Sequence, residues 1–174
     1  MTVRPTVSIV STDDAWKSLE ITGEWSRFAD AKAGALVAAA GLLAGLMIQE
    51  APTLRAFGRE PVRAGLLAVA LVSLVVTAAL CLHALLPRTG IGAPRSLIHF
   101  EAVAGRYTDD QASFVDAHLR LVADPERLRR QIAEQIWANS VVAHRKYRNI
   151  KLATYSLAVA MATGAAAGIL GRLV

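Results

Sequence analysis

The chain has 174 residues, of which 54% are hydrophobic, and its formal net charge is +5. Average soluble domains use ~45–50% apolar residues, and here the excess is gathered in three long runs. The single cysteine, Cys81, excludes an intrachain disulfide framework and a zinc site built on cysteines. Because the positive residues cluster beside the apolar runs, they favour a membrane topology signal, and we expect no nucleic-acid partner.

Residues 1–32 are predicted to be a cytoplasmic segment, a loose tail followed by a helix. Ser11 or Thr12 can cap that helix. Asp30 and Lys32 close the segment, and a helical period of about 100° per residue places them ~160° apart. They therefore cannot simply neutralise each other. Either both lie at the membrane surface, with the lysine extended toward the headgroups, or each contacts a different partner helix or a ligand.

Residues 33–48 are the first predicted transmembrane helix. The run is short for a span, but the segment from Phe28 onward suffices if its charged end lies in the interface. Gly41 and Gly45 form a GxxxG pair, a spacing that lets another helix approach closely. Residues 49–63 are expected to be a short outer loop, so that the first two spans form a hairpin.

Residues 64–86 are the second predicted transmembrane helix, and they contain no charged side chain. A helix rises ~1.5 Å per residue, so this run covers about 34 Å, enough for the ~30 Å hydrocarbon core of a bilayer. Ser73, Thr77 and His83 are its polar interruptions. A proline and an arginine follow, and they are expected to end the helix because neither suits a helix in lipid.

Residues 87–151 are predicted to be a cytoplasmic helical sensing region. Segments 96–107 and 109–122 have the pattern of short helices. Asp124 and Pro125 are typical of a helix start, with the acid at the cap and the proline at the first position.

The helix that begins at Pro125 is predicted to continue into residues 152–170, the third transmembrane helix. Gly164 and Gly168 repeat the GxxxG spacing there. The expected fold class is all-α: an integral membrane protein of three transmembrane helices, with a cytoplasmic helical region between spans two and three.

One stripe of that long helix carries Asn139 and Lys146 among apolar residues. These side chains either close a packing seam by pairing with acids such as Asp30, or line a site for an anion. The opposite side is expected to face solvent or headgroups, and it carries Arg130, Trp137 and Arg148.

Charge predicts the orientation of the chain in the membrane. Fifteen lysines and arginines lie in residues 1–32 and 87–151, against four in the outer loop and the C-terminal end. The positive-inside rule therefore places the N-terminus and the central polar region in the cytoplasm. A basic cluster lies at the end of that region. We interpret it mainly as a topology signal, with a ligand site as the alternative. The cluster comprises His144, Arg145, Lys146, Arg148 and Lys151.

Sequence signatures of catalysis are missing. No glycine-rich phosphate loop follows a strand, and no zinc-protease helix or nucleophile elbow occurs. The four histidines do not recur at helical ligand spacing, so no metal site is expected. We expect a protein that is not an enzyme and holds no cofactor.

Several short motifs keep a characteristic order relative to the three spans. They are Trp25 with residues 28–33 (Phe-Ala-Asp-Ala-Lys-Ala), Leu86-Pro87-Arg88, Ile98-His99-Phe100, and elements between residues 131 and 146. With these motifs, from about residue 20 to 170, the chain resembles the Pycsar transmembrane effector family.

The resemblance implies an antiphage effector that acts by abortive infection. In such systems a neighbouring cyclase makes cyclic UMP or cyclic CMP upon infection. The effector is expected to receive that signal and impair the inner membrane, killing the cell before phage matures. The expected partners are this nucleotide, membrane lipids and further copies of the chain.

A cyclic mononucleotide carries one phosphodiester charge, a sugar and a flat base. Lys32, Arg145 or Lys146 is expected to contact the phosphate. Asn139 is expected to pair with the edge of the base. Trp137, Tyr147 or Phe100 is expected to stack on the face of the base. Binding at the junction of the N-terminal helix and the helix from residue 125 would shift how the spans associate. The helix-packing positions would be Asp30, Gly41, Gly45, Gly164 and Gly168.

Two other functions compete with this one. A small channel or transporter subunit without a nucleotide trigger would line a path with polar residues, whereas Ser73, Thr77, Cys81 and His83 make no continuous polar face. A membrane scaffold would instead recruit a protein partner through its cytoplasmic helices. A cyclase gene beside this one would favour the effector, and a cargo-type operon the transporter.

Overall fold

The structure, a computed structural model, describes residues 11–52, 54–86 and 96–173. Its elements are α1 (Thr12–Met47), a 3-10 turn (Ile48–Glu50), α2 (Leu54–Arg59), α3 (Pro61–Leu85), α4 (Phe100–Tyr107), α5 (Gln111–Val122) and α6 (Pro125–Leu173). The described ranges contain helices and no strand, so the predicted all-α class is confirmed. The predicted tail, residues 1–10, and the predicted stop at Pro87 and Arg88 lie outside the described residues.

Three helices are long and apolar enough to cross a membrane, by their length and composition: Thr12–Glu50, Pro61–Leu85 and Pro125–Leu173. The first predicted span is not a separate helix, because α1 runs from Thr12 to Met47 without a break. The third span likewise continues directly from the helix that starts at Pro125. In both α1 and α6, one continuous α-helix therefore contains a polar segment followed by an apolar one.

Local capping explains where these helices start. The Ser11 Oγ accepts a hydrogen bond from the Asp14 N–H at 3.1 Å, which satisfies a free donor at the start of α1. At the start of α6, Asp124 Oδ1 accepts from the Arg127 N–H at 3.0 Å, with Pro125 at the first helical position. The predicted start at Asp124 and Pro125 is therefore confirmed.

Asp110 caps α5 by accepting a hydrogen bond from the Ser113 N–H at 3.0 Å. Hydrogen bonds from the side chain and the backbone of Ser113 lower the pKa of Asp110 from its ordinary value. Folding thus favours the charged carboxylate. This contribution to stability is present above the ordinary pKa of aspartate and is lost as the pH falls through the lowered value.

We expect Ser113→Ala to raise the Asp110 pKa back toward the ordinary value, because the side-chain hydrogen bond is removed and the backbone one remains. A carboxyl-carbon NMR titration measures this shift directly. An Asp110 pKa that does not change in the variant would contradict the assignment of Ser113 as the cause.

The described chain forms two compact units, and α1 and α6 contribute to both. The first unit combines Met1–Arg27 with Pro87–Ala143. Its buried core consists of Leu97, Leu121, Leu128 and Ile132, with partly buried neighbours that include Leu19, Tyr107 and Phe114. Gln131 on α6 accepts a hydrogen bond from the Leu97 N–H at 3.1 Å, which ties the segment before α4 to this core.

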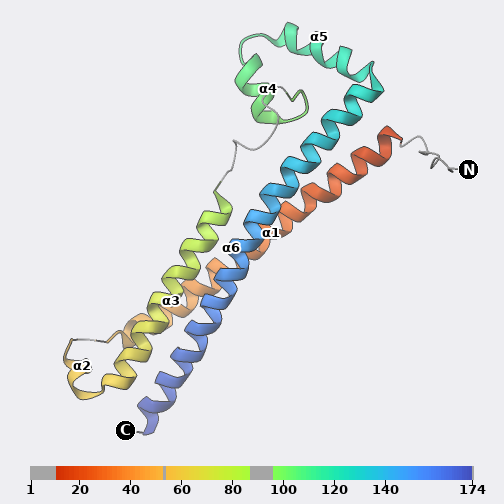
Figure 1. Ribbon diagram of the computed structural model, residues 1–174. Coiled ribbons are helices and arrows are strands. Elements are labelled where there is room, and N and C mark those ends of the chain that lie inside the picture. Colours follow the sequence, from red (N-terminus) through yellow and green to blue (C-terminus); the bar gives the residue numbers. More distant parts are fainter. Residues whose placement is uncertain (1–10, 53, 87–95, 174) are drawn as a thin grey trace, which may run out of the picture. The chain divides into compact units, whose positions relative to one another are not determined.

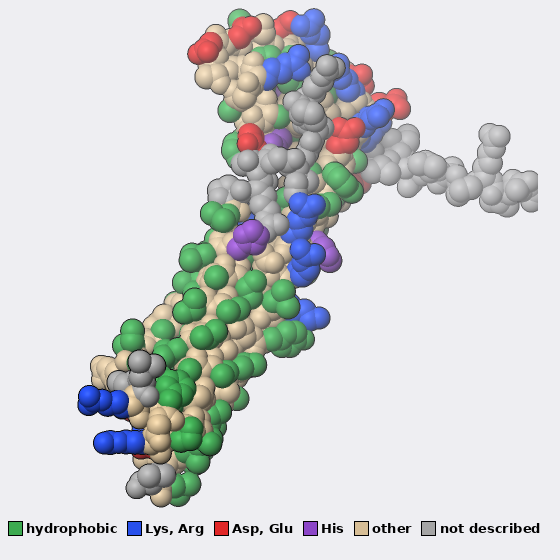
Figure 2. All heavy atoms as spheres, turned by 60° about the vertical axis from the view of Figure 1, so that its left-hand side comes forward, with side chains coloured by type: hydrophobic (Ala, Val, Ile, Leu, Met, Phe, Trp, Pro, Cys, Tyr) green, Lys and Arg blue, Asp and Glu red, His purple; other side chains and the backbone are tan. Residues whose placement is uncertain are grey.

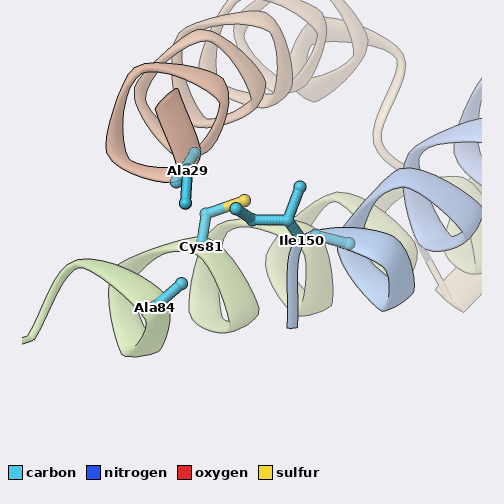
Figure 3. Close-up of a cluster of buried hydrophobic side chains, with 6 residues drawn as sticks. Ala29, Cys81, Ala84 and Ile150 are labelled. Atoms are coloured by element: carbon cyan, nitrogen blue, oxygen red, sulfur yellow. The ribbon is translucent and has the colours of Figure 1, made fainter. Parts of the chain in front are cut away.

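The second unit combines Phe28–Leu86 with His144–Val174. In it α1, α3 and α6 lie side by side, and α2 lies in the connection between α1 and α3 (Figure 1). One buried cluster draws residues from all three long helices, and all but Ile150 are small: Ala29, Ala33, Cys81, Ala84, Ile150 and Ala153. Figure 3 shows Ala29, Cys81 and Ile150 directed toward one another from α1, α3 and α6. Small side chains at such positions let helix backbones approach closely.

Polar groups of the second span contribute to helix packing. The Thr77 Oγ1 donates to the Ser73 carbonyl at 2.8 Å and lies 3.4 Å from the Ala153 carbonyl of α6. The Ser156 Oγ donates to the same Ser73 carbonyl at 2.8 Å. Two of these contacts join α3 to α6, so both hydroxyls contribute to the packing of the bundle.

The outer surface of the second unit is apolar. Figure 2 shows hydrophobic side chains spread over the visible face of this helical bundle. Leu42 and Val75 are each 68% exposed, and Ile169 is 63% exposed. A surface of this kind is unfavourable in water and is matched by the acyl chains of a bilayer.

Candidate functional site

An ion pair joins α1 to α6 in the second unit. The Lys146 Nζ lies 2.6 Å from the Asp30 Oδ1. The lysine side chain is 10% exposed, whereas that of the aspartate is 42% exposed. A buried ammonium group needs an anionic partner, because an unpaired charge away from water is costly. The pairing of Lys146 with an acid, one of the two alternatives for this residue, is therefore present, and its partner is Asp30.

Asn149 is a polar residue of this region that the sequence analysis missed. Lys146, Asn149, Ile150 and Ala153 are all buried, and their spacing places them on one face of α6. The Asn149 Nδ2 is buried and has no hydrogen-bond partner within the described residues. The signal that finds it is its distance of one helical turn from Lys146.

Lys32 contacts α6 at the position next to Lys146. Its Nζ lies 5.3 Å from the centroid of the Tyr147 ring, a cation–π geometry. Asp30 and Lys32 thus both contact α6, at the adjacent residues Lys146 and Tyr147, and not two different partner helices as one of the predicted alternatives had it. Lys151 makes a similar contact with Tyr155, at 5.9 Å. Lysine–tyrosine pairs of this kind suit the boundary between lipid tails and headgroups.

The seven predicted ligand residues are divided between the two units. Lys32, Arg145, Lys146 and Tyr147 belong to the second unit, and Phe100, Trp137 and Asn139 belong to the first.

The three predicted residues of the first unit have different surroundings. Phe100 is 72% exposed and Trp137 is 64% exposed. Asn139 Oδ1 accepts a hydrogen bond from Gln135 Nε2 at 2.9 Å, and Gln135 itself is buried. Asn139 would therefore have to share or exchange this bond in order to contact a base.

The described ranges contain no group of three or more His, Cys, Asp or Glu side chains arranged to hold a metal ion. Within the second unit the candidate site comprises cations, a buried amide and an aromatic ring: Lys32, Lys146, Asn149 and Tyr147. Such a set can hold a flat anionic molecule by charge, hydrogen bonds and stacking.

The glycine pairs differ in what surrounds them. A Cβ on Gly164 would clash with the Met47 Cε, the end of a flexible side chain that packs on α6 there, and it would lie 3.9 Å from the Ala70 Cβ of α3. A Cβ on Gly41, Gly45 or Gly168 would meet open space within the described chain. Of these four glycines, Gly164 alone has a close neighbour within the described residues, and the other three remain available to lipid or to another helix.

We expect Gly164→Leu to lower the stability of the bundle by roughly 1–3 kcal/mol, because the leucine must displace the Met47 side chain and crowds Ala70 of α3. The matched variant Gly168→Leu should melt like the wild type, since its Cβ enters open space. Thermal melting of detergent-purified protein measures both. Equal melting temperatures for the two variants would contradict this packing.

Comparison with known proteins adds independent information. The PycTM family, described as the Pycsar effector protein domain, matches residues 14–171. The Pycsar effector protein MePycTM of Micromonospora echinofusca is 46% identical over 59 residues, which are 34% of this chain and 100% of the relative. PtPycTM of Propioniciclava tarda is 32% identical over 147 residues, which are 80% of this chain and 69% of the relative. No solved structure matches the chain.

The family match extends from the start of α1 almost to the end of α6, and so it includes residues of both units and all three membrane-length helices. The predicted resemblance is confirmed, and the chain belongs to the PycTM family of Pycsar effector proteins.

Proposed function

We propose that the chain is switched on by a cyclic pyrimidine mononucleotide, cyclic UMP or cyclic CMP, made by a partner cyclase, and then impairs the bacterial inner membrane. Family membership supports a role as an antiphage effector. The observation that carries the membrane part of the proposal is the set of three membrane-length helices. Killing the infected cell before phage matures is the outcome that such damage would have.

The proposed orientation places the N-terminus and residues 87–151 in the cytoplasm, where a soluble nucleotide is made. Its support is the charge bias, with fifteen lysines and arginines in these segments and four in the others. The chain acts as a receiver, without catalysis and without a cofactor.

The proposed ligand contacts are ordinary for a nucleotide. Lys32, Arg145 and Lys146 would supply positive charge to the phosphate, and Tyr147 would stack on the base. The other predicted contacts, Phe100, Asn139 and Trp137, belong to the first unit. Binding must favour one arrangement of the helices over another, since a ligand with equal affinity for both would change nothing.

Self-association is part of the proposal. Gly41 and Gly45 lie on α1 with open space beside them, and Gly168 does so on α6. Helices in lipid associate through such small residues. A change in helix arrangement could thereby be passed to neighbouring copies and to the surrounding lipid.

The proposal is tested by expressing the chain with an inducible pyrimidine cyclase and following membrane potential with a fluorescent dye. Depolarisation is expected with the active cyclase and not with a catalytically dead one. The double variant Lys146→Ala/Asn139→Ala is expected to keep its potential. Equal depolarisation in that variant would show that the proposed site is wrong, and no depolarisation in the wild type would contradict the function itself.

A further inference from the structure

The two side chains of the Asp30–Lys146 ion pair differ in their exposure to solvent, and this difference affects anion binding. The ammonium group belongs to a side chain that is 10% exposed, and the carboxylate to one that is 42% exposed. Lys146 therefore needs an anion beside it, while Asp30 can return to water at little cost. An anion arriving from outside can exchange with this carboxylate.

Asn149 would favour an incoming anion over the Asp30 carboxylate in such an exchange. It is 8% exposed, and it lies one turn from Lys146 on the same buried face of α6. Its Nδ2 has no acceptor in the described chain, although Lys146 already has Asp30. Buried donors without acceptors are unfavourable, and an anion with several acceptor oxygens can satisfy two donors where this carboxylate satisfies one.

We propose that Lys146 and Asn149 form a phosphate-binding site within the second unit, and that the Asp30 carboxylate occupies the place of the phosphate in the resting protein. The ligand class is a phosphodiester or phosphate monoanion. Its identification as the phosphate of a cyclic nucleotide rests on the function proposed above. Asn149 is the new binding residue, and Asp30 is an internal competitor.

The exchange links binding to helix packing. The Asp30–Lys146 contact joins α1 to α6, so an anion that takes Lys146 removes this connection. Anything that weakens the contact must equally strengthen anion binding, because the two equilibria are coupled reciprocally. The ligand would thereby bias the bundle toward an arrangement in which α1 is less firmly held.

Calorimetric titration of the full chain in lipid nanodiscs with cyclic UMP and cyclic CMP tests the proposal. Asp30→Asn should tighten binding by about tenfold, because the competitor is neutral, and Asn149→Leu should weaken it by about tenfold. Asn149→Leu should also melt at the same temperature as the wild type or higher, since an unpaired donor is removed. The control Arg148→Gln, an exposed cation on the same helix, should bind like the wild type.

The charge-swapped variant Asp30→Lys/Lys146→Asp separates binding from folding. It can restore the ion pair and the melting temperature, but it places a carboxylate where the phosphate would lie, so binding should be lost. Binding restored together with stability would overturn the proposal, since Lys146 would then be structural only. Unchanged affinity in Asn149→Leu would overturn it as well.

Inorganic phosphate distinguishes the site from the nucleotide function. It should raise the melting temperature of the wild type, raise that of Asp30→Asn further, and leave the charge-swapped variant unaffected. This pattern without nucleotide binding would support the anion site and contradict the function proposed above. Its absence, with or without nucleotide binding, would overturn the anion site.

Discussion

Replacing Ala33 by leucine is expected to disrupt the three-helix bundle and to abolish the effector response. Ala33 is fully buried, and its cluster also holds Ala29, Cys81 and Ala153, each of which is 0% exposed. Three added carbon atoms cannot fit between helices that approach through alanines, and the cost should be about 3 kcal/mol. Thermal melting in detergent and depolarisation under an active cyclase measure the two effects.

The matched control is Ala35→Leu, two residues along the same helix. Ala35 is exposed, so the larger side chain there should meet lipid and leave both measurements as in the wild type. If Ala33→Leu behaved like this control, the packing of α1 against α3 and α6 in the second unit would be wrong.

Breaking the Asp30–Lys146 pair is expected to have unequal effects from its two ends. Asp30→Ala should lower stability by about 2 kcal/mol, because it leaves a buried ammonium group without an anion. This cost is below the roughly 3–5 kcal/mol expected on breaking a fully buried ion pair, because the Asp30 side chain is 42% exposed. Lys146→Met should cost much less, because methionine suits the buried position and the remaining carboxylate can be hydrated.

Melting temperatures of the two variants in the same detergent test this asymmetry. The double variant Asp30→Asn/Lys146→Met is the reference, since it has neither charge. A larger loss in Lys146→Met than in Asp30→Ala would contradict the burial of the lysine, and with it the role given to Asp30.

The membrane-length helices could be predicted because their signals are local. An uncharged run as long as residues 64–86 has few stable alternatives to a membrane span. The start of α6 at Pro125 follows from an aspartate cap and a proline at the first position, which act within one turn. The continuity of α6 follows from the absence of a proline after that start.

The partners within the site could not be predicted from the sequence with the same certainty. A helical wheel places Lys146 on a buried face, but Asp30 is 116 positions away, and only the packing of α1 on α6 decides that they meet. Asn149 was missed because a single amide on an apolar stripe resembles an ordinary interruption of the pattern. The division of α1 and α6 between two units depends on long-range contacts, which no local pattern encodes.

The glycine pairs show the same limit. The GxxxG spacing predicts that a helix can approach, but not which helix does so, or in what register. Gly164 has Met47 beside it, whereas Gly168, one turn further, has open space. The repeated GxxxG motif therefore predicts surfaces where helices can pack. The structure shows that Gly164 has a neighbour within the described chain, whereas Gly41, Gly45 and Gly168 have open space beside them.

Reconstituted liposomes with a potassium diffusion potential test the central claim most directly. Purified chain is inserted, cyclic UMP or cyclic CMP is added, and the potential is followed with a dye. The account predicts that one of these nucleotides dissipates the potential, and that the charge-swapped variant Asp30→Lys/Lys146→Asp does not respond. A potential unaffected by either nucleotide, in vesicles shown to contain inserted protein with its cytoplasmic side accessible, would contradict the claim that this membrane protein is a nucleotide-triggered effector.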